Sequence, residues 1–234
     1  MTKCMVRIIL LAILMCEMMH ARTYTSKFPN AENPLSENGA WINGGTVGLD
    51  WHDCRTTPAF AFGTEPATIN YDDSTCLVTG TWGADQTVEV TIHTVSPGAH
   101  ATFEEVEVRL RSKISAHVNT GYEVNCSVKP GDPYMQIVRW NGALGDFTQL
   151  NGSNVGCVDG DVLKATISGS KITAYKNGKA IITVTDTKFT TGLPGMGFYI
   201  QSGSSSANDD FGASSFMATD GVVDAPTGLA AVVH

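Results

Sequence analysis

The stretch "GDVLKATISGSKITAYKNGKAIITVTDTKFTTGLPGMGFYI", residues 160–200, decides the fold class. Short runs of alternating or β-branched apolar residues follow one another with glycine-containing turns between them, and apolar residues do not recur at the helical spacing of 3.6. Asn177-Gly178 separates two of these runs and favours the type I′ turn of a hairpin, because both turn residues need positive φ. Gly169-Ser170 predicts another tight turn. The stretch therefore predicts consecutive antiparallel strands.

The same pattern extends outward over most of the chain. The clearest predicted strands are 86–95, 105–112, 121–128, 134–140, 161–169, 171–176, 179–186 and 195–202. Asn141-Gly142 predicts a further hairpin turn after one of them. A single sheet of roughly ten strands would expose too much apolar surface, so we expect an all-β fold with two antiparallel sheets, a β-sandwich of the jelly-roll kind.

The two ends of the chain differ from this pattern. Residues 1–21 place Lys3 and Arg7 before an apolar run that is too short to anchor in a bilayer, which is typical of a secretory signal peptide. We therefore expect a secreted, extracellular protein whose single domain spans residues 22–220. The tail, residues 221–234, contains "DAPTGLAAVV", which resembles the first strand of a fibronectin type III repeat. It is either a linker or the start of a truncated following module, and in the second case the chain is part of a larger modular extracellular protein.

Cysteine usage agrees with export. Removal of residues 1–21 leaves an even number of cysteines, Cys54, Cys76, Cys126 and Cys157, in a compartment where disulfides persist. Four cysteines allow three pairings, and we expect Cys54 with Cys76 and Cys126 with Cys157 because each pair closes a modest loop. No C-x-x-C motif occurs, so a structural zinc site is not predicted.

Charge and motifs exclude several classes of partner. The formal net charge is -8 and the isoelectric point about 5.1, so a phosphate backbone or an anionic membrane surface is repelled on average. We expect no nucleic-acid partner and no membrane insertion. Phosphate-binding loops, dinucleotide fingerprints and the Gly-x-Ser-x-Gly elbow are absent from the sequence.

Several motifs in the second half recur in one group of proteins. They are Gly160-Asp161, Gly169, Tyr175-Lys176-Asn177-Gly178, Asp186, and the glycines from Gly192 through Gly197. With these motifs the chain resembles the concanavalin A-like lectin and glucanase superfamily, especially its laminin-G-like jelly rolls. The resemblance covers roughly residues 28–220 and implies a jelly roll whose first and last strands lie side by side. It does not settle activity, because the superfamily includes lectins, hydrolases, lyases and adhesion domains.

The resemblance also implies a metal. Members of the superfamily often bind a structural calcium near the paired chain ends, and Asp209 and Asp210 match that position. Calcium requires hard oxygen ligands, so we expect these two aspartates as its ligands. The alternative is that Asp-Asp is ordinary turn chemistry in a solvated loop.

The strand "EEVEVRLRS", residues 104–112, carries the main candidate site residues. Alternation sends Val106, Val108 and Leu110 to one face, and Glu105, Glu107, Arg109 and Arg111 to the other. If the chain is an enzyme, Glu105, Glu107 and Arg109 are the catalytic candidates. Laminarinase-like members, however, place Glu, Asp and Glu at i, i+2 and i+5, and here the third position is Leu110 rather than an acid.

A lyase would use other residues of the chain. Arg109 or Arg111 would neutralise a uronate, and Tyr122, Tyr199 or His117 would move the proton. Alginate-lyase-like sandwiches carry a Gln-Ile-His strand, whereas Gln136-Ile137 is followed here by valine.

Noncovalent sugar binding needs fewer special residues. The candidates for carbohydrate contact are Glu107, Arg109, Arg111, Arg139, Trp140, Tyr199 and Gln201, which combine hydrogen-bonding groups with aromatic rings. The alternative is that the charged row forms cross-strand ion pairs on an exposed sheet. We therefore expect a lectin-like, carbohydrate-binding module, with a polysaccharide-degrading enzyme or an adhesive laminin-G-like module as the alternatives.

Overall fold

The computed structural model describes residues 21–68 and 70–221, so most of the predicted signal peptide and tail lie outside the described residues. Their strands are β1 (Thr23–Ser26), β2 (Trp41–Asn43), β3 (Arg55–Thr57), β4 (Phe60–Phe62), β5 (Ser74–Val78), β6 (Gln86–Thr94), β7 (Phe103–Ser115), β8 (Val118–Ser127), β9 (Met135–Gly142), β10 (Phe147–Ser153), β11 (Val162–Ser168), β12 (Lys171–Lys176), β13 (Lys179–Thr185), β14 (Leu193–Gln201) and β15 (Phe211–Thr219). A short 3-10 helix, η1 (Ser205–Asp209), precedes β15. Within these ranges no helix is long and apolar enough to cross a membrane.

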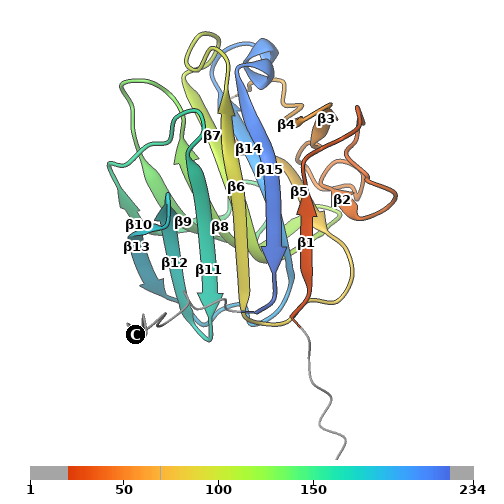
Figure 1. Ribbon diagram of the computed structural model, residues 1–234, viewed down its shortest axis with the longest axis vertical. Helices are drawn as coiled ribbons and strands as arrows, with labels where there is room; N and C mark the ends of the chain where they lie inside the picture. The colour runs from red at the N-terminus through yellow and green to blue at the C-terminus, as the bar shows by residue number, and fades with distance from the viewer. Residues whose placement is uncertain (1–20, 69, 222–234) are drawn as a thin grey trace, which may run out of the picture.

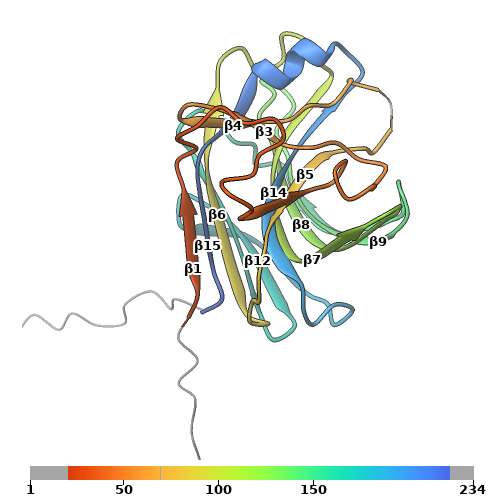
Figure 2. The same cartoon turned by 90° about the vertical axis from the view of Figure 1, so that its right-hand side faces the viewer.

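The strands form two antiparallel sheets that pack face to face. One sheet has the order β13-β12-β11-β6-β15-β4-β3, with β1 paired to β15, and the other has the order β10-β9-β8-β7-β14-β5-β2. Figure 1 looks onto the first sheet, and Figure 2, turned by 90°, shows the two layers side by side. The pairing of β1 with β15 brings the first and last strands together. The expected two-sheet β-sandwich is confirmed.

Alternation along each strand builds the core between the sheets. On β7, Val106, Val108 and Leu110 are fully buried there, as the period of two predicts. The opposite row of β7 lies on the outer face of the seven-stranded sheet. That outer face is not simply exposed, because Leu49 and Trp51 pack on it and form a second, smaller hydrophobic cluster with β9.

The predicted turns are found with one displacement. The β12–β13 hairpin turns at Asn177 and Gly178, which have φ of 50° and 77°, as a type I′ turn requires. A hairpin also joins β9 to β10, but its turn is not at Asn141-Gly142, where it was predicted. Strand β9 continues through Gly142, and the chain reverses over residues 143–146. The backbone N–H of Asn141 donates to the backbone carbonyl oxygen of Asp146 and closes this turn.

One of the two predicted disulfides is present. Cys126 and Cys157 are bonded, whereas Cys54 and Cys76 are buried free thiols, so the prediction of a Cys54–Cys76 bond is corrected. Burial raises the pKa of the Cys54 thiol well above its ordinary value, and the neighbouring Cys76 raises this pKa further. Because the thiolate is the species that forms disulfides, this environment disfavours the reaction.

Candidate functional site

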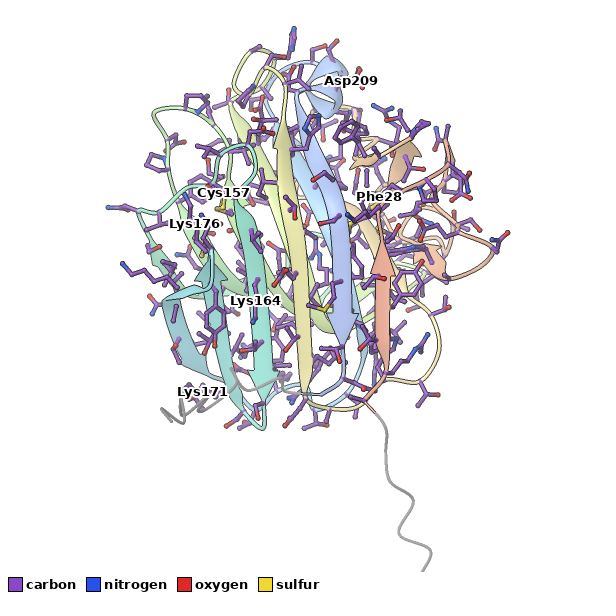
Figure 3. All side chains as sticks on the ribbon, viewed as in Figure 1. Phe28, Cys157, Lys164, Lys171, Lys176 and Asp209 are labelled. Atoms are coloured by element: carbon purple, nitrogen blue, oxygen red, sulfur yellow. A yellow bond between two sulfur atoms is a disulfide. The ribbon has the colours of Figure 1, made fainter. Side chains whose placement is uncertain are left out.

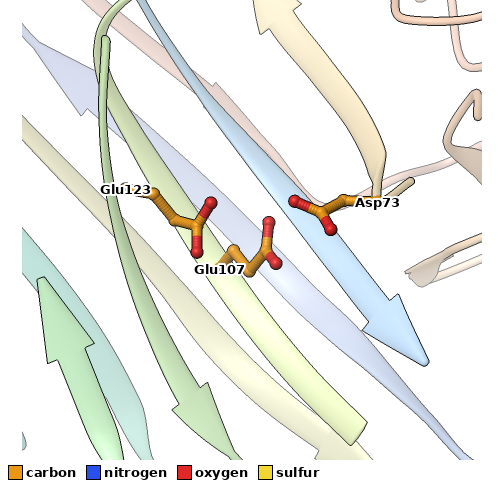
Figure 4. A group of neighbouring side chains, drawn as sticks. All are labelled: Asp73, Glu107 and Glu123. Carbon is orange, nitrogen blue, oxygen red and sulfur yellow. The ribbon is translucent and has the colours of Figure 1, made fainter. Parts of the chain in front are cut away.

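Strand β7 presents its charged row on the outer face of the seven-stranded sheet. Its register with β8 places Arg109 opposite Glu123 and Glu107 opposite Asn125. Asp73, which immediately precedes β5, reaches the same place from across β14. Figure 4 shows the carboxyl groups of Asp73, Glu107 and Glu123 turned toward one another over the sheet.

Arg109 joins these three carboxylates. Its Nη2 lies 2.7 Å from Asp73 Oδ2, its Nη1 lies 2.6 Å from Glu123 Oε2, and it also pairs with Glu107. All four side chains are at most 4% exposed. Trp51 covers the group, with the guanidinium carbon of Arg109 4.9 Å from the centroid of its ring. Buried charges of this kind persist only where they are paired and hydrogen-bonded.

The acids of this face hold protons more tightly than free carboxyl groups do. Burial raises the pKa of Asp73 to about 7, against the opposing effect of Arg109, and Glu123 raises it further. Burial likewise raises the pKa of Glu107 well above its ordinary value. Glu105, two residues along the row, has its pKa raised by burial to about 8, although it accepts a hydrogen bond from Tyr134. One guanidinium therefore cannot keep all of these carboxyl groups ionised at neutral pH.

A groove lies above this charged group, and we define it as two adjoining pockets. The first has an empty volume of about 330 Å³, including the part that opens to solvent, and is lined by Tyr71, Asp73, Glu105, Glu107, Glu123, Asn125, Val138, Trp140, Phe147 and Tyr199. The second has an empty volume of about 730 Å³ by the same measure and is lined by Tyr71, Phe103, Glu105, Asp132, Tyr134, Gln136, Phe147, Tyr199 and Gln201. Because four of these residues line both pockets, the groove is continuous.

Aromatic rings form one wall of the groove. Tyr199 stacks on Tyr71 at 6.3 Å between centroids, and Tyr71 meets Phe147 edge-on at 5.0 Å. Phe147 in turn contacts Trp140, which packs edge-on against Trp51. Tyr71 is 45% exposed, so its ring is available to a ligand. Rings of this kind beside buried polar groups are the usual lining of small-ligand sites.

One hydrogen-bond acceptor in the groove has no partner in the described structure. Asn125 is 5% exposed, and its Nδ2 donates to Glu123 Oε1 at 3.1 Å, which fixes the orientation of the amide. Its Oδ1 is buried and unpartnered. A buried acceptor without a donor is costly, so this oxygen favours a ligand that brings a donor.

The structure gathers some of the sequence-predicted residues and separates others. Glu107, Trp140, Tyr199 and Gln201 line the groove, and Arg109 lies beneath it. Arg111 and Arg139 were predicted to share this face, and the structure corrects both predictions, each for a local reason.

Arg111 leaves the row at a β-bulge. The register of β7 with β8 shifts between Leu110 and Lys113, and Arg111 adopts a positive φ of 48°. Its guanidinium donates instead to the carbonyl oxygens of Ala84, Phe189 and Gly169.

Arg139 lies on the other face of β9. Gln136, Val138 and Trp140 point into the groove, so period-two alternation turns Arg139 the opposite way. There it pairs with Asp186 and also donates to Asn141 Oδ1.

The sequence reasoning missed other residues of the groove and its charged group, among them Tyr71, Asp73, Glu123, Asn125 and Phe147. A signal existed for two of them, because Glu123 and Asn125 alternate with apolar residues in "GYEVNCSV" just as the row of β7 does. Tyr71 and Asp73 come from an irregular segment, and no periodic pattern identifies them.

The expected calcium site at Asp209 and Asp210 is not formed. Asp209 is mostly exposed and pairs with Arg55, whereas Asp210 is buried and pairs with His100 and accepts from Ser96. Each carboxylate already has its own donor, so the two do not converge on one ion as calcium requires. Asp73, Glu107 and Glu123 do place oxygen atoms within 4.8 Å of one another, but all three are already bonded to the guanidinium of Arg109, which lies among them. These residues therefore do not fit a calcium ion.

The fold is a two-sheet β-sandwich with a groove on the outer face of one sheet, and comparison with solved structures agrees with this fold. No family model and no curated protein sequence matches the chain. Among solved structures, the carbohydrate-binding module CBM66 from Bacillus subtilis is similar at 17% identity and a TM-score of 0.53, over 72% of this chain and 96% of that one.

Two other solved domains are similar over more of the chain. The exoplasmic/lumenal domain of VIP36, in a Ca²⁺- and mannose-bound form, has 14% identity and a TM-score of 0.55 over 87% of this chain and 94% of that one. The carbohydrate recognition domain of Emp46p, in a metal-free form, has 11% identity and a TM-score of 0.58 over 86% of this chain and 97% of that one. At these identities the similarity shows a shared fold.

Proposed function

We propose that this protein is a secreted carbohydrate-binding module that holds a polysaccharide or glycan in the groove. The observation that carries the proposal is the aromatic wall of Tyr71, Tyr199, Phe147 and Trp140 beside buried polar groups. Sugar rings offer apolar faces for stacking and hydroxyl groups for hydrogen bonds, and the groove provides both. The similar solved structures, which include a carbohydrate-binding module and carbohydrate recognition domains, support the same function.

The cellular context of the proposal rests on the sequence. The signal-like residues 1–21 and the disulfide support export, and the tail supports a module within a larger extracellular protein.

The test compares retention on a panel of polysaccharides for the mature protein and two tyrosine variants. Tyr71→Ala removes the exposed ring of the groove, and Tyr175→Ala removes a partly buried ring of β12 on the other sheet. We expect Tyr71→Ala to weaken binding at least about fivefold, because truncating a central aromatic contact typically costs more than about 1 kcal/mol. Tyr175→Ala is expected to bind as the parent does, and equal effects of the two substitutions would contradict the groove as the site.

A degradative activity is the second candidate, and Glu105 is the observation that favours it. With a pKa raised to about 8, its carboxyl group is protonated at neutral pH, as a general acid must be. Glu107, the next residue of the same row, is engaged by Arg109, which weakens its case as a nucleophile. Release of reducing or unsaturated ends from any polymer in the panel, lost in Glu105→Gln, would establish this activity in place of simple binding. If the panel shows no retention and no release of ends, the adhesive alternative is favoured.

A further inference from the structure

The charges that line the groove are all of one sign. Its acidic lining residues are Asp73, Glu105, Glu107, Glu123 and Asp132, and no Lys, Arg or His lines either pocket in the described part of the chain. Three lysines of the other sheet, Lys164, Lys171 and Lys176 on β11 and β12, lie away from the groove (Figure 3). The groove is therefore an acidic, aromatic surface.

The group beneath the groove is also short of positive charge. Asp73, Glu107 and Glu123 share the one guanidinium of Arg109. Among its described contacts Glu105 has no basic partner, and the only positive charge that acts on it is that of Arg109, from a greater distance. The raised pKa values of Asp73 and Glu105 have the same origin, since burial and mutual repulsion make these carboxyl groups retain protons. A ligand cation at this place would supply positive charge that Arg109 alone does not provide.

Asn125 gives an independent indication of what the ligand must carry. Its unpartnered Oδ1 is buried and lines the first pocket, so the groove offers an acceptor that only a donor can satisfy. An ammonium group has three donors and no acceptor, and it binds favourably to carboxylates and to the faces of aromatic rings. A uronate carboxylate has only acceptors and would meet five acids.

We propose that the groove selects a sugar polymer that carries free amino groups, a deacetylated hexosamine chain, over neutral and anionic polymers. This inference rests on the proposed carbohydrate-binding function and names its ligand class. The amine occupies the first pocket, between the acids and Asn125, and the aromatic wall contacts the sugar rings. The second pocket, which shares Tyr71, Glu105, Phe147 and Tyr199 with the first, holds the neighbouring sugar unit.

The experiment uses matched ligands that differ at one substituent. Tetrasaccharides of β-1,4-linked glucosamine, N-acetylglucosamine and glucose share a backbone and differ only at carbon 2, and a uronate tetrasaccharide supplies the opposite charge. Calorimetric titration of the mature protein at pH 6.5 and 0.15 M salt is expected to show the glucosamine tetramer binding at least about tenfold more tightly than either neutral tetramer. The uronate tetramer is expected not to bind.

Variants separate recognition from general attraction to an acidic protein. Glu105→Gln and Asp209→Asn each replace a carboxyl group by a neutral amide, but Glu105 lines the groove and Asp209 is an exposed residue of η1 that lines neither pocket. Glu105→Gln is expected to reduce the preference for the amine by at least about fivefold, and Asp209→Asn to leave it unchanged. Asn125→Ala, with its unfolding temperature checked, provides a second groove variant with the same expected loss.

The outcomes distinguish this inference from the function on which it rests. If a neutral or uronate tetramer binds as tightly as the amine, or if Glu105→Gln and Asp209→Asn act equally, the amino-sugar preference is wrong and carbohydrate binding stands. If no tetramer and no polymer of the panel binds, the proposed function itself fails.

Discussion

Arg109 shows how one residue can convert a sheet face into a site. On an exposed strand its alternation with Glu105 and Glu107 would give weak surface ion pairs. Here Trp51 covers it and three carboxylates surround it, so the pairs are buried. Removing a single partner of such a group leaves an uncompensated charge and costs several kcal/mol, which makes the acids and the arginine one unit.

Glu105 leads to a prediction about the pH dependence of stability. Its folded pKa of about 8 lies above the ordinary value of 4.5, so the folded state binds the proton more tightly than the unfolded state does. Such a group contributes stability that is fully present below about pH 4.5 and is lost as pH rises through about 8. Asp73, with its pKa raised to about 7, acts in the same direction. We expect the unfolding temperature of the unliganded protein to fall between pH 5 and pH 8.

Glu105→Gln tests this assignment. The neutral amide removes the titration, so the variant should lose less stability between pH 5 and pH 8 than the parent, by at most about 1.4 kcal/mol for each pH unit. Urea unfolding at the two pH values measures the difference, with Asp209→Asn as a matched substitution of an exposed acid. A parent protein whose stability rises over this range would contradict the raised pKa values.

At the scale of elements, period-two alternation predicted most of the fold and part of the site. It assigned the core row of β7 correctly and placed Glu105, Glu107 and Arg109 on the face that bears the groove. It failed at Arg111, because a bulge shifts the register and no feature of "RLRSK" identifies that bulge in advance. It also could not foresee Asp73, which an irregular segment brings to the face through long-range pairing.

Gly197 on β14 gives a prediction at the scale of elements, because its backbone lies close to the charged group. An alanine at position 197 on β14 would bring its Cβ into overlap with the Glu107 carboxylate, 3.0 Å from Arg109 Nη2 and 2.9 Å from the Ser74 carbonyl oxygen. Gly197→Ala is therefore expected to destabilise the protein by more than about 2 kcal/mol, as overpacking of a tight site does, and to abolish ligand binding.

Gly178→Ala is the matched control for this substitution. It adds the same methyl group in the β12–β13 turn, where nothing lies within 4 Å of the new Cβ and only the positive φ of 77° is strained. We expect a loss of about 1 kcal/mol with binding unchanged. Denaturant unfolding and titration with the tetrasaccharides measure both effects, and a variant at position 197 that binds normally would show that the charged group tolerates displacement.

At the scale of the whole molecule, the two faces of the seven-stranded sheet have different roles. Its inner face belongs to the main core, and its outer face carries the small cluster of Leu49, Trp51, Val138 and Trp140. This second cluster excludes water from Arg109 and its partners, so the site depends on a loop that packs on the sheet as well as on the strands. The fold thereby places a groove over a buried charged group without a second domain.

The covalent framework of the molecule gives the last prediction. Cys126 and Cys157 are joined across a sequence separation of 31, and Cys54 and Cys76 are buried thiols. The loss of loop-closure entropy in the unfolded chain corresponds to about 3–4 kcal/mol for a loop of this length, so replacing both bonded cysteines by alanine is expected to destabilise the protein by about that amount. A thiol reagent should find two reactive cysteines in the denatured, unreduced mature protein and none in the folded protein, because both free thiols are inaccessible. Two thiols in denaturant confirm the single disulfide, whereas none would show that Cys54 and Cys76 are bonded in the purified protein.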